Sequence, residues 1–139
     1  MKKHLLAVQL SSFLVICTAK AEATKNYDIS GSLTPTKVSL QKPTFTYRLE
    51  IAPKSPWRLK TETPFQVWLK PTKGLTLDKT EFANTDLLSL ENDKKAIQVA
   101  GKALEKGKQR LETHVSFFLC SDEVCQRFKE EISVKVEVQ

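Results

Sequence analysis

Apolar and polar residues alternate one by one along several stretches of the chain, which is the pattern of β-strands with one buried face. Residues 45–51 show this alternation, and residues 65–69 repeat it directly after Pro64. It is clearest near the C-terminus, at residues 111–120 and again at residues 132–138. In residues 111–119 the odd-numbered positions make up the apolar face, which places Cys120 on the opposite face.

Weaker signals fill the rest of the chain. Residues 27–29 and 38–40 are short alternating pieces, interpreted as edge strands, and residues 75–77 and 96–99 are further short strands. The lysine-rich stretch 101–110 contains Gly107 and is expected to be a loop. Prolines and glycines separate the short strands, and no stretch has the period of an amphipathic helix. The pattern predicts an all-β protein with a single antiparallel β-sandwich.

The first residues have the composition of an export signal. Lys2 and Lys3 precede a mostly apolar run at residues 5–17, and small residues follow up to Ala23. We interpret residues 1–23 as a signal peptide and residues 24–139 as the sandwich domain. A lipoprotein modified at Cys17 is the alternative, but Ile16 stands where a small residue is expected. The short lysine-rich leader is typical of bacteria, so the expected location is the periplasm or the exterior.

Charge and apolar runs bear on the partners of the mature domain. The whole chain has 22 Lys+Arg and 16 Asp+Glu. Removal of Lys2, Lys3, Lys20 and Glu22 with the leader lowers the net charge from +6 to about +4. The lysines are scattered among glutamates, so no nucleic-acid partner is expected. No run after the leader approaches the roughly 20 apolar residues of a membrane span.

Two cysteines remain in the mature domain, Cys120 and Cys125. Two thiols this close, in an oxidising compartment, are expected to form one disulfide across the end of a hairpin. A bridge closing so short a loop stabilises a fold by only about 2 kcal/mol, which leaves both a structural and a redox interpretation open. Asp122 and Glu123 disfavour a thiolate, while Arg127 and Lys129, which follow in the sequence, act in the opposite direction.

Other chemistry has little support in the sequence. His114 is the only histidine after the leader, whereas structural zinc needs four ligands, so no metal site is expected. No Gly-flanked nucleophile accompanies His114, so the sequence offers no catalytic set of a hydrolase. No cofactor is expected either. Trp57 and Trp68 could line a ligand groove, although aromatic residues of sandwiches more often pack in the core or at its rim.

The cysteine segment carries a resemblance to a known family. A strand that leads into Cys120, four residues, Cys125 and a final alternating strand resembles the N-terminal periplasmic domain of the thiol–disulfide interchange protein DsbD. Residues 47–51, Trp57 and Pro64 resemble the early strands of that family, and the similarity covers roughly residues 45–138. The resemblance implies an immunoglobulin-like fold, a redox pair formed by Cys120 and Cys125, and a cap loop in which Phe82 would shield the cysteines.

Two functions from different classes follow. The first is a periplasmic thiol–disulfide exchange module or adaptor that uses Cys120 and Cys125, with a thioredoxin-like protein as a candidate partner. The alternative is a non-enzymatic binding or structural domain of the envelope, in which the Cys120–Cys125 disulfide only stabilises a hairpin. Both expect a protein partner in the periplasm or envelope.

Overall fold

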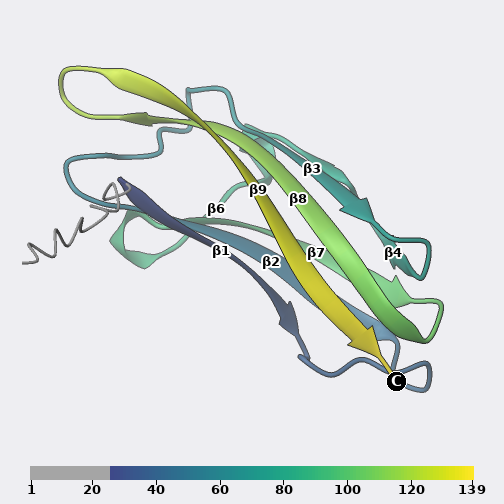
Figure 1. Ribbon diagram of the computed structural model, residues 1–139. Helices are drawn as coiled ribbons and strands as arrows, with labels where there is room; N and C mark the ends of the chain where they lie inside the picture. Colours follow the sequence, from purple (N-terminus) through teal and green to yellow (C-terminus); the bar gives the residue numbers. More distant parts are fainter. Residues whose placement is uncertain (1–25) are drawn as a thin grey trace, which may run out of the picture.

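The computed structural model describes residues 26–139, which form two β-sheets packed face to face (Figure 1). Every pair of neighbouring strands is antiparallel. The strands of sheet A, in spatial order, are β1 (Tyr27–Thr34), β2 (Thr44–Pro53), β7 (Lys95–Ala103) and β4 (Leu75–Leu77), with β6 (Leu88–Ser89) also beside β7. The strands of sheet B are β5 (Glu81–Phe82), β3 (Gln66–Pro71), β8 (Gly107–Cys120) and β9 (Cys125–Val138).

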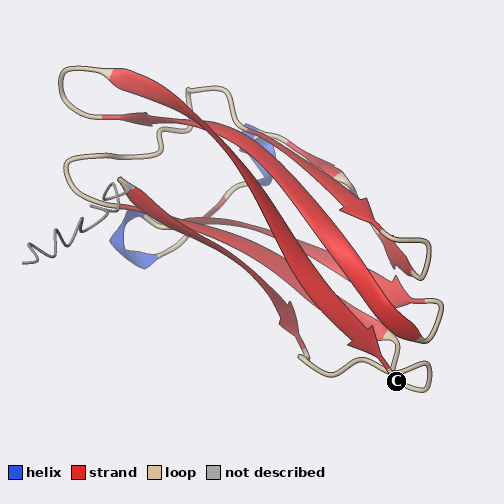
Figure 2. Ribbon diagram, viewed as in Figure 1, coloured by secondary structure: helices blue, strands red, loops and turns tan. Residues whose placement is uncertain are grey.

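Helix is confined, within the described residues, to two single-turn 3-10 segments, η1 (Asn84–Asp86) and η2 (Glu91–Asp93) (Figure 2). The strand orders β1-β2-β7-β4 and β5-β3-β8-β9 correspond to the two sheets of an immunoglobulin-like sandwich. The predicted fold class is therefore confirmed.

Each long strand buries one face, as the alternation predicts. In β2 the buried positions are two residues apart, with Tyr47, Leu49 and Ile51 at most 1% exposed. In β8, Leu111, Phe117 and Leu119 are fully buried and face the other sheet. Because successive side chains of a strand point to opposite faces, a core between the two sheets follows directly from this pattern.

One polar pair lies inside this core and joins the two sheets. The Tyr47 hydroxyl on β2 and the Thr113 hydroxyl on β8 are 2.5 Å apart, and both residues are 0% exposed. Burial raises the pKa of Tyr47, and the hydrogen bond with Thr113 acts in the opposite direction. The pair gives each hydroxyl a partner in a region that excludes water, which is the condition for burying such groups without a large cost.

The β8–β9 hairpin has the longest strands in residues 26–139, with 14 residues in each. Its register runs without interruption from Gly107 opposite Val138 to Cys120 opposite Cys125. The loop expected at residues 101–110 is therefore much shorter, because β7 continues to Ala103 and β8 begins at Gly107. Gly107 lies at the turn with a φ of 107°, a conformation that favours glycine. Its presence therefore indicates a tight turn and not the longer loop that was expected.

Residues 38–40, interpreted above as an edge strand, instead form a short parallel bridge with the end of β9. Val38 pairs with Val138, and the Gln139 amide donates to the Val38 carbonyl at 3.0 Å. The segment thereby covers the end of the β9 edge near the C-terminus (Figure 1).

The predicted signal peptide, residues 1–23, and the alternative lipid site at Cys17 lie outside the described residues. Within residues 26–139 no helix is both long and apolar enough to cross a membrane.

Candidate functional site

The two cysteines close the tip of the β8–β9 hairpin at the end away from the C-terminus (Figure 1). Cys120 is the last residue of β8 and Cys125 the first of β9, and their sulfur atoms form a disulfide with a length of 2.03 Å. The predicted bridge is thus confirmed, and the residues that join the two strands are 121–124. The Ser121 amide donates to the Val124 carbonyl at 2.8 Å, which closes this turn.

The two halves of the bridge lie in different surroundings. Cys120 is 2% exposed, whereas Cys125 is exposed. The difference has a structural cause, because Cys120 has a neighbour on each side: Cys125 on one and Arg58 on the other. Arg58 and Cys120 exchange two backbone hydrogen bonds of 2.9 Å each. Cys120 is therefore in a central position of the sheet, and Cys125 is at its edge.

The segment that carries Arg58 is itself held in place at both ends. At its start the Lys54 amide donates to the Asn26 carbonyl at 2.8 Å. At its end the Asn84 side-chain nitrogen donates to the Thr61 and Thr63 carbonyls. The Asn84 side-chain oxygen accepts from the Phe65 amide, directly before β3. This anchoring keeps the segment beside the end of β8, so the strand neighbour of Cys120 is part of the folded framework.

Arg58 was not singled out from the sequence as a neighbour of the cysteines. A local signal was present, since half-buried Trp57 and buried Leu59 flank exposed Arg58 in strand-like alternation. That signal predicts an extended segment but cannot say which strand it pairs with, because the pairing joins residues far apart in the chain.

Phe82 does not come together with the cysteines. It is 6% exposed in the core, on β5, where it pairs with Val67, which in turn pairs with Val115 of β8. Cys120 lies five residues further along β8, about 16 Å at the usual strand rise. A shielding role for Phe82 therefore has no counterpart in this arrangement, and the segment that pairs beside Cys120 is the one at Arg58.

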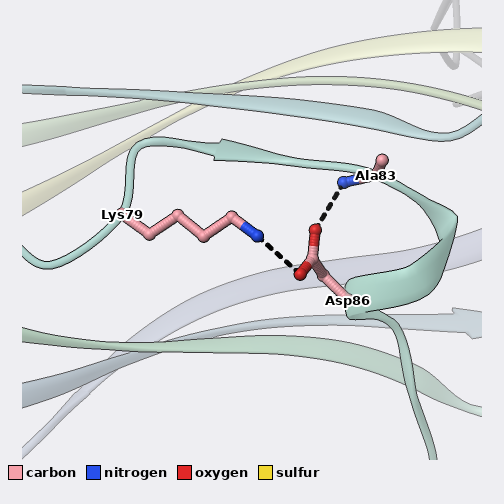
Figure 3. A network of polar contacts seen from close by, with 3 residues as sticks. All are labelled: Lys79, Ala83 and Asp86. Carbon is pink, nitrogen blue, oxygen red and sulfur yellow. Dashed lines mark hydrogen bonds and ion pairs between the residues drawn. The ribbon is translucent and has the colours of Figure 1, made fainter.

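A polar network fixes the turn that follows Phe82 (Figure 3). The Asp86 carboxylate accepts from Lys79 Nζ at 2.6 Å and from the Ala83 amide at 2.8 Å. The Lys79 ammonium also lies 5.4 Å from the centre of the Phe82 ring. The hydrogen bond from Lys79, helped by the one from Ala83, holds the pKa of Asp86 below its ordinary value.

This shift predicts a contribution to stability that depends on pH. Because the folded-state pKa of Asp86 is below its unfolded value, the contribution is present above about pH 4 and is lost as the pH falls through the folded pKa. We expect the unfolding free energy of the wild type to fall more steeply from about pH 5 to about pH 2 than that of Asp86→Asn. Urea denaturation at several pH values measures this, and parallel pH profiles would contradict it.

His114 and the tryptophans lie away from the disulfide. His114 is on the outer face of sheet B, with its ring nitrogens 3.3 Å from Glu131 and 3.8 Å from Glu112. No group of three or more possible metal ligands occurs among residues 26–139. Trp57 packs partly against the core, whereas Trp68 is 39% exposed on the outer face of sheet B.

No protein-family model matches the chain, and no curated protein gives a significant match. Among solved structures, it is similar to AggA, the major subunit of aggregative adherence fimbriae type I from Escherichia coli, with a TM-score of 0.40 and 10% identity over 84% of this chain and 98% of that one. A conjugative transposon lipoprotein from Bacteroides eggerthii gives a TM-score of 0.41 and 14% identity over 79% of this chain and 97% of that one. The CooA pilin subunit from enterotoxigenic Escherichia coli gives a TM-score of 0.30 and 14% identity over 83% of this chain and 99% of that one. Scores and identities this low carry no inference about function.

Proposed function

We propose that this protein is an exported β-sandwich of the bacterial envelope that acts by binding another envelope protein. In this proposal the Cys120–Cys125 disulfide stabilises the end of the β8–β9 hairpin and takes no part in chemistry. The observation that carries this structural role of the disulfide is the placement of Cys120, which is buried and has backbone hydrogen bonds with an anchored neighbouring segment. A sulfur in the middle of a sheet is suited to holding strands together.

The size of the expected stabilisation fits a local clamp. The bridge closes a loop with a sequence separation of 5, for which loop-closure entropy gives only about 2 kcal/mol. The rest of the hairpin also has an uninterrupted ladder of paired residues between β8 and β9. The disulfide therefore fixes the tip of a hairpin that the sheet already forms.

We expect Cys120→Ala with Cys125→Ala to lower the unfolding free energy by about 2 kcal/mol while the variant still folds. Alanine is chosen because a serine at position 120 would bury a hydroxyl, which adds a separate cost. Urea denaturation of the oxidised wild type and the variant measures the difference. Failure of the variant to fold would show that the bridge is essential to the sandwich.

The function is tested by capture of a partner in the periplasm. Wild type and the cysteine-free variant are compared by chemical cross-linking through lysines, followed by mass spectrometry. Binding without thiol chemistry predicts the same cross-linked partner with both proteins. A partner captured only by a single-cysteine variant, and released by reductant, would contradict the proposal and favour exchange.

A second candidate is thiol–disulfide exchange, favoured by the exposure of Cys125 at the sheet edge and by the resemblance to the DsbD N-terminal domain. A thiolate of a dithiol partner would attack Cys125 Sγ, forming a mixed disulfide while Cys120 Sγ leaves as a thiolate. The partner's second thiol would then displace Cys125, so that the partner is oxidised and this protein reduced. A reduction potential well above about −300 mV would favour this function over a structural bridge.

A further inference from the structure

The outer face of sheet B contains a groove of about 440 Å³. We call it the sheet B groove and define it by Trp68 and Lys70 on β3, His114 and Ser116 on β8, and Arg127 and Lys129 on β9. Two acidic residues of β9, Glu130 and Glu131, also line it. The groove follows β8, with β3 along one side and β9 along the other. Its shape has a simple cause, since the central strand contributes the small Ser116 and the flanking strands contribute long side chains.

The cations of the sheet B groove have no acidic partners in residues 26–139. Lys70, Arg127 and Lys129 form no ion pair there. The carboxylates around the groove interact with other residues. Glu130 accepts a hydrogen bond from the Tyr27 hydroxyl, and Glu131 lies 3.3 Å from His114. Glu112, the register partner of Lys70, pairs with Arg110 and His114. The groove therefore presents three cations that form no ion pair within residues 26–139, beside two carboxylates that interact with other residues.

Arg127 is oriented across the floor of the groove. Its Nε donates to the Ser116 hydroxyl at 3.2 Å, although the two residues are not direct register partners. Because Nε is held by the protein, the terminal nitrogens of the guanidinium remain to donate to a ligand. A planar fork of this kind is suited to a carboxylate.

Trp68 adds an apolar surface beside the charges. It is 39% exposed, and its register partner on β8 is His114 at the floor of the groove. Tryptophan and arginine are the residues that most often dominate binding energy at protein interfaces. An exposed tryptophan beside unpaired cations is thus suited to a ligand with both acidic and apolar groups.

The spacing of the cations indicates the shape of that ligand. Arg127 and Lys129 are two residues apart on one strand, so their side chains emerge about 6.6–6.8 Å apart on the same face. An extended peptide presents alternate side chains at the same interval. Acidic residues at every second position would therefore meet both cations in turn.

We propose that the sheet B groove binds an extended acidic segment of a partner protein, with carboxylates on Arg127, Lys129 and Lys70 and an apolar side chain on Trp68. The inference rests on the proposed binding function and names the surface and the chemistry of the partner.

The test uses a fluorescently labelled peptide of glutamates with one central phenylalanine, with the matching glutamine peptide as the neutral probe. Fluorescence anisotropy measures binding to the oxidised protein. We expect the acidic peptide to bind and the glutamine peptide not to bind. We also expect the affinity to fall when ionic strength rises from about 0.01 M to about 0.15 M, because the Debye length shortens from about 30 Å to about 8 Å.

Charge reversal separates the groove from general electrostatics. We expect Arg127→Glu with Lys129→Glu to weaken binding by about tenfold or more, and Trp68→Ala to weaken it by a similar factor. The matched control is Lys73→Glu with Lys102→Glu, which changes net charge equally at exposed positions away from the groove. The control should lose less than about threefold. Thermal melting checks that all variants fold.

Three results would overturn the inference. One is equal loss in the groove variant and the control, which would show binding to overall charge. Another is a groove that binds vesicles containing phosphatidylglycerol but not the acidic peptide. The third is unchanged cross-linking of a periplasmic partner by Arg127→Glu with Lys129→Glu, which would leave the proposed binding function standing and place the interface elsewhere.

Discussion

Phe117→Ala is expected to lower the unfolding free energy by about 3–5 kcal/mol, the largest effect of any single change considered for this protein. Phe117 is 0% exposed, and its ring lies 5.0 Å from that of Tyr27 and 5.7 Å from that of Phe128. Truncation removes a buried ring and leaves a cavity between β1, β8 and β9. Urea denaturation measures the loss. If the alanine variant is too unstable, Phe117→Leu should retain the fold at a smaller cost, because leucine leaves a smaller cavity than alanine.

The next residue is a matched control. Phe118 has the same side chain on the same strand, but it faces outward and is only half-buried. Phe118→Ala should cost about 1 kcal/mol, since the site is open to solvent and little cavity remains. Equal losses at the two positions would contradict the assignment of the β8 faces.

The second large effect is expected at the polar pair inside the core. Tyr47→Phe leaves the Thr113 hydroxyl buried without its partner, and Thr113→Val does the same to Tyr47. Each single change should cost about 1–3 kcal/mol, because a buried polar group then loses its hydrogen bond. The double variant should cost clearly less than the sum, since no orphaned hydroxyl remains.

A double-mutant cycle measured by urea denaturation gives the coupling between these two hydroxyls directly. Additive losses would mean that the hydroxyls are satisfied independently and that their 2.5 Å approach does not join the sheets. As a reference pair, Thr76→Val with Thr85→Val removes two exposed hydroxyls and should change stability by less than about 0.5 kcal/mol each.

The candidate site was partly accessible from the sequence. The position of Cys120 at the end of one strand and of Cys125 at the start of the next follows from alternation and a short turn, and the bridge is found there. The cap role suggested for Phe82 depends on contacts between distant segments, and the fold places Phe82 in the core beside Val67. The exchange function itself stays a prediction.

The sheet B groove could not be predicted from the sequence, because its residues come together only in the folded sheet. Trp68 and Arg127 are far apart in the sequence and each reads as an ordinary surface residue of a half-buried strand. Only the order β3-β8-β9 brings them to the two sides of Ser116. The lack of acidic partners for the cations is likewise a property of the assembled face.

The sequence by itself determined which faces of β2, β3, β8 and β9 are buried, because an extended backbone points successive side chains in opposite directions whatever lies around it. It also determined that Cys120 and Cys125 meet, because a four-residue connection returns the chain beside itself. Only the tertiary structure decided that Cys120 is central and Cys125 is at an edge, since Arg58 comes from a segment distant in the chain. Exposure depends on the neighbouring strand, and no local pattern specifies that neighbour.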